Sequence, residues 1–266
     1  MKRGKKMSLF KIVRVSFFLM TIIFSNSIRS INPCISIITS LYKGDLFIKG
    51  FLDDITQQTI FNDCELIIIN ANSPGNEEQI ISSYMQAYPN IVYRRLDYDP
   101  GIYAVWNEGI QMARGDFITN ANVDDRLANN CYEVHLKQLL DHPKIDLVYS
   151  DCYVTKHPNQ TFANHTRHSI LARPQFSKDA LKKVCLPNNH PMWRKSLHEK
   201  YGYFDTAYKI AGDWEFWLRI VYQGAQFLKI ERILSLYYLN PNGLSTNDNG
   251  NWKHEFDRVY YTYKNQ

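Results

Sequence analysis

From Pro33 onward, short apolar runs alternate with segments whose apolar residues recur at helical spacing. The runs CISIITS (34–40), CELIIIN (64–70) and IVYRRL (91–96) read as strands, and the first two are apolar enough to be buried on both faces. Helical spacing follows in LFIKGFLDDITQQ (46–58) and in IYAVWNEGIQMARG (102–115), where we expect Gly115 to occupy the C′ position. This alternation restricts the chain to an α/β fold with a mostly parallel, doubly wound sheet flanked by helices.

Each predicted strand of this region ends in a group of polar residues. The groups are Thr39 with Ser40, residues 70–73, Asp97 with Asp99, and residues 122–125. In open parallel sheets, ligands bind beyond the carboxyl ends of the strands. The sequence therefore predicts a ligand site at that edge of the sheet.

Asp124 and Asp125 stand side by side after the fourth predicted strand, in DFITNANVDDR. Adjacent carboxylates repel each other, and a bound Mg²⁺ or Mn²⁺ that also holds phosphate oxygens would remove the repulsion. The other interpretation is a solvated helix cap, because Asp is favoured at helix starts and a helical segment follows at 131–142. These residues alone leave both interpretations open.

The second half of the chain is less regular. It contains a predicted helix at 131–142, a strand at 145–155, a polar loop with His165 and His168, a helix at 210–224 that stops at Gly224, and one or two strands after it. Internal repeats and flexible linkers are not apparent. We therefore expect one domain over 33–266, in which residues 33–126 form one half and residues 127–266 form a smaller, mixed half.

Charge and cysteine usage exclude some classes of protein. The formal net charge is +5, but seven of the Lys and Arg residues lie in the first 29 positions, so the rest of the chain is nearly neutral and offers no nucleic-acid surface. The five cysteines are scattered and never form a CxxC pair, which favours neither a disulfide framework nor a zinc site. A reducing compartment is the simpler interpretation.

The first 32 residues form a basic and apolar leader. A basic start is followed by an apolar run from Val15 to Phe24, which resembles a signal peptide but is shorter than the ~20 residues that span a bilayer. A cleaved signal, a basic amphipathic segment on a membrane surface and a leader without function are the three interpretations. Because the five unpaired cysteines favour a reducing compartment, we expect a cytoplasmic protein in which residues 1–30 remain attached and at most tether it to a membrane.

The chain resembles the family 2 glycosyltransferases of the GT-A fold over nearly all of residues 33–246. The matching pieces occur in the family's order: ISIITS, ELIIINANSPGN, DYDPGIYAVWNEGIQMARGDFITNANVDDRL, HPMWRKSLHEKYGYFD and GDWEFWLR. The resemblance implies an inverting enzyme that binds a nucleotide-sugar across the carboxyl edge of the sheet, with Mn²⁺ or Mg²⁺ as cofactor. It also implies that residues 33–126 form the nucleotide-sugar-binding half and residues 127–266 the acceptor-side half.

The resemblance also implies roles for individual residues. Asp125 corresponds to the metal ligand, Asp124 to the acid near ribose and diphosphate, and Asp99 to the carboxylate that accepts a hydrogen bond from the base. The further positions expected to bind donor or acceptor are Thr39, Ser40, Asn70, Asn107, His190 and Ser245. Asn70 and Asn122 stand where many relatives have an acid, and Asn both donates and accepts hydrogen bonds, which leaves the choice of nucleotide open.

GDWEFWLR supplies the expected catalytic base. Asp213 matches the acid that deprotonates the acceptor hydroxyl, although Gly212 replaces the acid that commonly precedes it. Glu215 lies two residues later, roughly 200° around the helix at ~100° per residue, so the two carboxylates cannot face one cleft. Capping of the helix by Asp213 is the structural alternative, and both roles can hold together.

Other polar residues of the second half fit less specific roles. His165, His168 and His190 match no standard metal-ligand spacing, and Arg167 and Arg173 are candidates for contacting the leaving group.

We therefore expect an enzyme that transfers a sugar from a nucleotide diphosphate, with a UDP-sugar as the expected donor, to a hydroxyl of a glycan or lipid-linked acceptor. The expected partners are donor, acceptor and a membrane surface, without nucleic acid. A non-catalytic module that binds sugar-nucleotide or glycan on the same fold is the alternative, supported by the missing acids at 70, 122 and 212. A nucleotidyltransferase ranks last, because the chain lacks a glycine-rich loop with a basic residue after the first strand.

Overall fold

In a computed structural model of the chain, residues 32–266 form one compact unit, of which residues 32–187, 189–244, 246 and 252–264 are described. Four parallel strands in the order β3-β2-β1-β4 build its first part. They are β1 (Ile35–Leu41), β2 (Cys64–Asn70), β3 (Ile91–Arg95) and β4 (Phe117–Asn120). The parallel sheet predicted for this region is confirmed.

The second part of the sheet is mixed and continues outward from β4 in the order β8-β6-β9-β5. Its strands are β5 (Arg126–Leu127), β6 (Leu147–Thr155), β8 (Met192–Arg194) and β9 (Phe227–Tyr238), with β7 (Ser169–Leu171) paired to β6. β8 is antiparallel to both β4 and β6, whereas β6 and β9 are parallel to each other. The α/β class with a mostly parallel sheet and a smaller mixed portion is thus confirmed.

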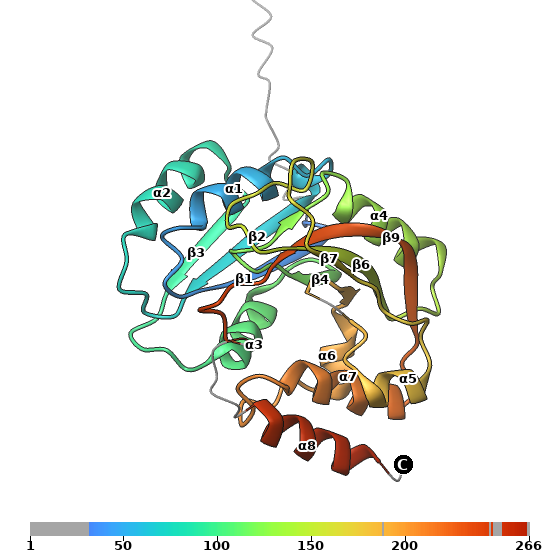
Figure 1. Cartoon of the computed structure of the whole chain (residues 1–266). Coiled ribbons are helices and arrows are strands. Elements are labelled where there is room, and N and C mark those ends of the chain that lie inside the picture. Colours follow the sequence, from blue (N-terminus) through green and yellow to red (C-terminus); the bar gives the residue numbers. More distant parts are fainter. Residues whose placement is uncertain (1–31, 188, 245, 247–251, 265–266) are drawn as a thin grey trace, which may run out of the picture. The chain divides into compact units, whose positions relative to one another are not determined.

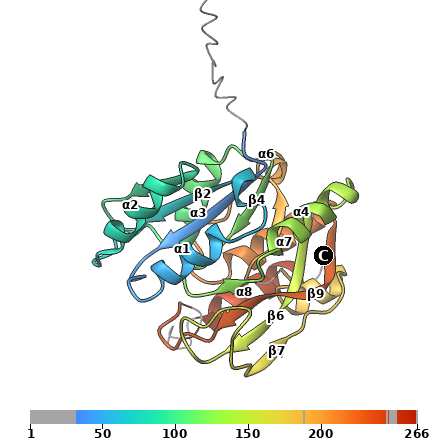
Figure 2. The same cartoon turned by 90° about the horizontal axis from the view of Figure 1, so that it is seen from above.

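Helices cover both faces of the sheet (Figure 1). The helices α1 (Ile48–Thr56), α2 (Glu77–Ala87) and α4 (Cys131–Asp141) pack on one face, which Figure 2 views from above. The helices α3 (Ile102–Met112), α5 (Lys178–Lys183), α6 (Ser196–Tyr201), α7 (Gly212–Tyr222) and α8 (Trp252–Tyr263) pack on the other face. A single 3₁₀ turn, Phe61–Asp63, leads into β2 among the described residues.

Two hydrophobic cores result from the alternation of side chains along the strands. Ile37 packs into the core under α1, α2 and α4, whereas its neighbour Ile38 packs into the core under α3 and α7. Both are essentially inaccessible to solvent. Because side chains of β1 and β2 enter both cores, these strands must be apolar almost throughout, which is the pattern from which they were predicted.

Two glycines test the predicted helix ends. Gly224 follows α7 with φ +105°, a left-handed conformation that favours glycine, as expected. The C′ assignment of Gly115 is wrong, because α3 ends at Met112 and Ala113 after it is extended. Gly115 is required for another reason: a Cβ there would lie 2.8 Å from the main chain of Ile35 and Ser36 in β1.

Two predictions about the whole chain can be compared with these residues. The five cysteines form no disulfide in the part of the chain that is described. None of the helices described here has the length and apolar character needed to cross a bilayer. The leader at 1–31 lies outside the described residues.

Candidate active site

The strand ends predicted to hold a ligand lie together at one edge of the sheet. Leu41 of β1 pairs with Asn70 of β2, and Asn70 pairs with Arg95 of β3. On the other side of β1, Ile38 pairs with Asn120 at the end of β4. The polar residues that follow β1 to β4 therefore share the carboxyl edge.

Asp125 is buried at this edge, and hydrogen bonds already occupy both of its carboxylate oxygens. Oδ1 accepts the main-chain N–H of Tyr238 at 2.9 Å. Oδ2 accepts the side-chain amides of Asn122 at 3.0 Å and Asn189 at 3.2 Å. His190 Nε2 lies 3.4 Å from the same Oδ2 and makes no hydrogen bond among the described residues. This carboxylate joins β4, β9 and the segment before β8.

Asp124 is less enclosed than Asp125. Its Oδ2 accepts the side-chain amide of Asn240 at 2.9 Å, just after β9. Burial, and then repulsion from Asp125, raise the pKa of Asp124 to about 6. A carboxylate with this environment is stabilised in its ionised form by a nearby cation.

Among the described residues, Asp124 and Asp125 are the main candidates for binding a cation. No group of three or more His, Cys, Asp and Glu side chains gathers as a metal site in the described ranges. Mg²⁺ and Mn²⁺ nevertheless need few protein ligands where a substrate diphosphate and water complete the shell, so the pair at 124 and 125 fits such a cation. Of the two, Asp124 accepts fewer hydrogen bonds and so has more coordination capacity left.

Asn70 does not present its amide group to a ligand. Its Oδ1 accepts the N–H of Ser73 at 2.6 Å, and its Nδ2 donates to the hydroxyl of Tyr93 at 3.0 Å. The residue is fully buried. Asn70 thus shapes the turn after β2, and we infer that it affects the choice of nucleotide only through that turn.

The two β1 residues and Asp99 differ in accessibility. Thr39 is fully buried, and its Oγ1 has no hydrogen-bond partner among the described residues, whereas Ser40 is partly buried. Asp99 is exposed, and its Oδ1 accepts the N–H of Gly101, whose φ is +90°. A hollow of about 380 Å³ adjoins it, lined in part by Asp97 and Pro100. Asp99 is therefore within reach of a ligand at the edge of the sheet.

Asn107 connects α3 to the loop after α6. Its Nδ2 donates to the carbonyl of Phe204 at 2.8 Å, and its Oδ1 accepts the N–H of the same residue at 3.0 Å. Both ends of the amide are thus bonded to one main-chain residue. The structure gives Asn107 a structural contact in place of the expected donor contact.

Asp213 is partly buried at the amino end of α7. Its Oδ1 lies 3.1 Å from the hydroxyl of Tyr103, and its Oδ2 lies 3.7 Å from the thiol of Cys185. Burial is the main cause that raises the pKa of Asp213 above its ordinary value. Because α3 begins directly beyond β3, the contact with Tyr103 brings Asp213 to the carboxyl edge.

Glu215 points elsewhere, as the helical spacing predicts. Both of its oxygens accept the guanidinium of Arg219, at 2.9 and 3.1 Å, and Oε1 also accepts the hydroxyl of Tyr263 in α8. This buried carboxylate ties α7 to the helix that follows β9. It has the contacts of a structural ion pair.

One short segment reaches both acidic positions. Cys185 contacts Asp213, whereas Asn189 and His190 contact Asp125. Cys185 and Asn189 are four residues apart, and successive Cα atoms are 3.8 Å apart, so their Cα atoms are separated by at most about 15 Å. This stretch of sequence thus links the surroundings of Asp125 to those of Asp213.

The other predicted residues that are described make contacts of different kinds. His165 packs against Tyr153, and Arg167 lies over the same ring. His165 and His168 do not join His190 in a metal site among the described residues. The main chain of Arg173 donates to Asp151. Ser245 lies outside the described residues.

Sequence reasoning missed four side chains at the site: Tyr103, Cys185, Asn189 and Asn240. Tyr103 lies in the quoted piece that begins DYDPGIYAVWN, and Asn189 immediately precedes the quoted piece HPMWRKSLHEKYGYFD, so these segments were identified without a role for the two side chains. Cys185 and Asn240 carry no signal in sequence, because only tertiary packing places them beside Asp213 and Asp124.

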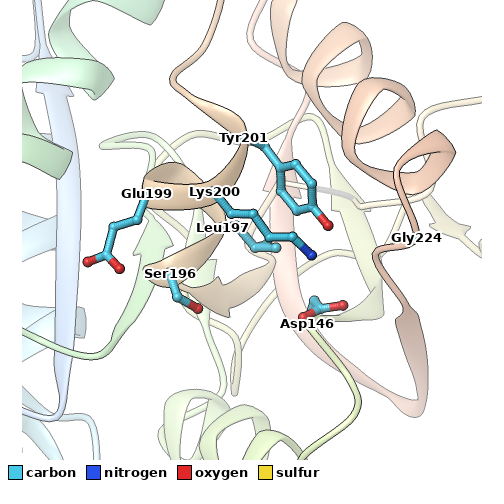
Figure 3. A pocket seen from close by; sticks show the side chains of 7 residues that line it. All are labelled: Asp146, Ser196, Leu197, Glu199, Lys200, Tyr201 and Gly224. Carbon is cyan, nitrogen blue, oxygen red and sulfur yellow. The ribbon is translucent and has the colours of Figure 1, made fainter.

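A further cavity lies at the opposite edge of the sheet (Figure 3). It measures about 410 Å³ and is lined by Asp146, which precedes β6, and by residues of α6 that include Lys200 and Tyr201. Since β6 runs parallel to the first four strands, this is the amino-terminal edge. None of the predicted site residues lines it.

Comparison with known proteins agrees with this geometry. The family model described as "Glycosyl transferase family 2" matches residues 36–202. The minor teichoic acid biosynthesis protein GgaB of Bacillus subtilis (strain 168) is 30% identical over 179 residues, which cover 60% of this chain and 20% of that protein. The aligned part is thus about a fifth of that relative's length.

Solved structures share the fold. S. aureus TarS 1-349 in complex with UDP has a TM-score of 0.67 at 14% identity, covering 86% of this chain and 64% of that one. The mannosyltransferase PcManGT from Pyrobaculum calidifontis, in complex with GDP-Man and Mn²⁺, has a TM-score of 0.63 at 18% identity, covering 80% and 59%. At these identities, the likeness establishes the fold alone.

Proposed function

This chain belongs to glycosyl transferase family 2, and from that premise we propose an inverting enzyme that uses a nucleotide-sugar donor and a divalent cation. The acceptor is the hydroxyl of a glycan or of a lipid-linked glycan. The observation that carries the proposal is that one short stretch of sequence contacts two acids: Cys185 contacts Asp213, whereas Asn189 and His190 contact Asp125 of the acid pair. Donor diphosphate and acceptor hydroxyl would be bound at the two ends of this segment.

Asp213 is the proposed base. Its raised pKa makes it a better proton acceptor than an exposed carboxylate. Its Oδ2 takes the proton of the acceptor hydroxyl. As that proton leaves, the acceptor oxygen forms a bond to the anomeric carbon, and the bond from that carbon to the diphosphate oxygen breaks on the opposite face. The product has inverted configuration, and the nucleoside diphosphate leaves.

We assign the cation to Asp124, with Asp125 fixing the loop beside it. When bound, the cation neutralises the negative charge that develops on the leaving diphosphate. Asp124 accepts one side-chain hydrogen bond among the described residues, whereas Asp125 accepts three hydrogen bonds. Asn240 orients Asp124, and the main chain of Tyr238 orients Asp125.

The donor is proposed to be a UDP-sugar. UDP and GDP-Man occur in the complexes of the two structural neighbours, so both nucleotides belong in the test. The name of the Bacillus subtilis relative refers to teichoic acid biosynthesis, which supports a cell-surface polysaccharide as the product.

The proposal is tested by screening UDP-sugars and GDP-mannose with Mn²⁺ for release of nucleoside diphosphate, first with water and then with glycan acceptors. With the donor and acceptor that give turnover, Asp213→Asn should retain donor affinity, because the amide keeps the size of the side chain and one acceptor oxygen. Transfer should fall by roughly 10²–10⁴-fold, the usual contribution of a positioned base.

Glu215→Gln is the matched control on the same helix. It also replaces a carboxylate by an amide, but at a group that contacts Arg219 and Tyr263, so transfer per folded molecule should change far less. Loss of transfer in Glu215→Gln with retention in Asp213→Asn would reverse the two roles. Donor binding without turnover of any donor would favour a non-catalytic binding module.

A further inference from the structure

Tyr103, in the first turn of α3, makes the contact with Asp213 that the proposed mechanism does not by itself require. Its hydroxyl oxygen lies 3.1 Å from Asp213 Oδ1 and 2.6 Å from the carbonyl oxygen of Ile210. The residue is only 3% exposed, and its ring packs edge-to-face on Trp106 and against Phe204. The hydroxyl therefore has a fixed position between two acceptors.

Gly212 leaves room for the ring of Tyr103 to lie beside the start of α7. A Cβ at 212 would lie 2.7 Å from Cε2 of Tyr103, closer than real Cβ atoms approach any atom. The residue immediately before Asp213 thus has no side chain because the ring of Tyr103 occupies the space. Gly212, which replaces the acid expected from the resemblance, therefore allows Tyr103 to contact Asp213.

We propose that Tyr103 is a positioning residue for the base, a role that rests on the proposed function of Asp213. A hydroxyl has one proton and can donate it to only one of its two neighbours at a time. While Asp213 is ionised, donation to Oδ1 stabilises the negative charge and aims Oδ2 at the acceptor. Once Oδ2 has taken the acceptor proton, the hydroxyl donates its hydrogen bond to the carbonyl of Ile210 instead. The hydroxyl therefore has an acceptor in both states of Asp213.

Besides Tyr103, the groups that lower the pKa of Asp213 by hydrogen bonding include the main-chain N–H of Trp214 and the thiol of Cys185. From the segment after α5, the Cys185 thiol faces Oδ2 at 3.7 Å and is also 3.4 Å from the carbonyl of Pro187, so it is a weak donor. Arg173 acts on this thiol electrostatically. Burial raises the pKa of the Tyr103 hydroxyl well above its ordinary value, so it keeps its proton throughout the neutral range.

The test is a titration of the Asp213 carboxyl in the whole protein, which needs no ligand. Carbon-13 NMR of protein labelled at the Asp carboxyl carbons follows each side chain with pH, and the signal absent in Asp213→Asn identifies the one of interest. Tyr103→Phe keeps the ring and removes the hydroxyl, so the titration midpoint should rise by on the order of one pH unit. Gly212→Ala, which displaces the ring, should raise it as well.

Tyr263→Phe is the control. It removes another tyrosine hydroxyl that lies 3.1 Å from a carboxylate of α7, but the carboxylate is Glu215. Its Asp213 midpoint should match that of the unmodified protein. Equal midpoints in Tyr103→Phe and Tyr263→Phe would overturn the proposal.

The outcome is separable from the proposed function. If Asp213→Asn retains transfer, the base assignment fails, whatever the NMR midpoints show. If Asp213→Asn abolishes transfer and Tyr103→Phe leaves the midpoint unchanged, the base stands and only the role of Tyr103 fails. Once an acceptor is identified, the dependence of kcat on pH can be measured as well. The pH at which kcat falls on the acidic side should be higher in Tyr103→Phe, in step with the NMR midpoint, which a purely structural contact would not cause.

Discussion

At the scale of single residues, the two adjacent carboxylates at 124 and 125 differ in how many hydrogen bonds they already accept. Asp125 bonds to two amides and to the main chain of β9. Asp124 bonds to Asn240 and has its pKa raised to about 6 by burial and by its neighbour. We infer that Asp125 shapes the loop and that Asp124 binds the cation.

This difference gives a prediction for cation-dependent binding. Asp124→Asn removes the carboxylate with spare coordination capacity, so Mn²⁺ should no longer strengthen binding of UDP, while the unfolding temperature should be retained or raised because two repelling charges become one. Asp125→Asn replaces one oxygen by an N–H₂ group beside amide donors, so it should lower the free energy of unfolding by about 1–3 kcal/mol. Calorimetry with UDP and Mn²⁺, together with thermal unfolding, measures both.

The opposite pattern would restore the assignment expected from the resemblance. In that case Asp125→Asn would lose the effect of Mn²⁺ while remaining stable, and Asp124→Asn would keep it.

Sequence placed the acidic residues of the site but not their partners. The positions of Asp124, Asp125 and Asp213 follow from strand ends and helix spacing, which are local patterns. Asn70 and Asn107 have the residue type of ligand contacts, yet both amides are bonded within the protein. Whether a polar group faces a ligand or its own main chain depends on tertiary packing, and periodicity does not encode it.

At the scale of elements, α7 depends on α8 for its amino end. The carboxylate of Glu255 in α8 accepts the N–H groups of Lys209, Ile210 and Ala211 at 2.8, 2.8 and 2.9 Å. These donors immediately precede the helix and point away from any intrahelical acceptor. A side chain from another helix thus satisfies the N–H groups beside the proposed base.

Removing this contact should loosen the start of α7. Glu255→Ala leaves three N–H groups without the carboxylate, so the free energy of unfolding should fall by about 1–3 kcal/mol, and transfer should fall with it because the carbonyl of Ile210 also contacts Tyr103. Denaturant unfolding measures the first effect. Asp257→Ala, at an exposed acid of the same helix, should stay within about 0.5 kcal/mol. Equal stability of the two variants would contradict the capping role.

The elements themselves were predictable where the pattern is long. Strands β1 and β2 and helix α7 lie within one or two residues of the expected bounds. Helix α8 was missed, although Phe256, Val259 and Tyr263 recur at helical spacing and supply the signal. Strand β8 has three residues and exists because β4 and β6 flank it, so no local pattern of its own identifies it.

At the scale of the molecule, residues 32–266 make up one compact unit with its own two cores. The division into a nucleotide-sugar half and an acceptor half stays a prediction. We expect a chain that starts at Asn32 to unfold at the same temperature as the full chain and to bind UDP and Mn²⁺ equally well. Differential scanning fluorimetry and calorimetry compare the two forms, and a lower unfolding temperature of the shorter chain would contradict this.

The same pair of proteins tests the expected role of the leader. Flotation with anionic vesicles should recover the full chain in the lipid fraction more than the shorter one, because basic residues near an anionic surface contribute about 1 kcal/mol each. Mass spectrometry of the natively expressed protein should find residues 1–30 attached. A mature start near Ile28 would establish cleavage instead.

The contact between Glu255 and the start of α7 also has a consequence for the order of events during synthesis. Glu255 is translated 44 positions after Ala211, whose N–H it accepts. The strands that present Asp124 and Asp125 emerge from the ribosome first and can pair at once, since domains fold progressively from the amino terminus. The proposed base gains its cap only when this later helix has emerged, so the start of α7 would be completed late in synthesis.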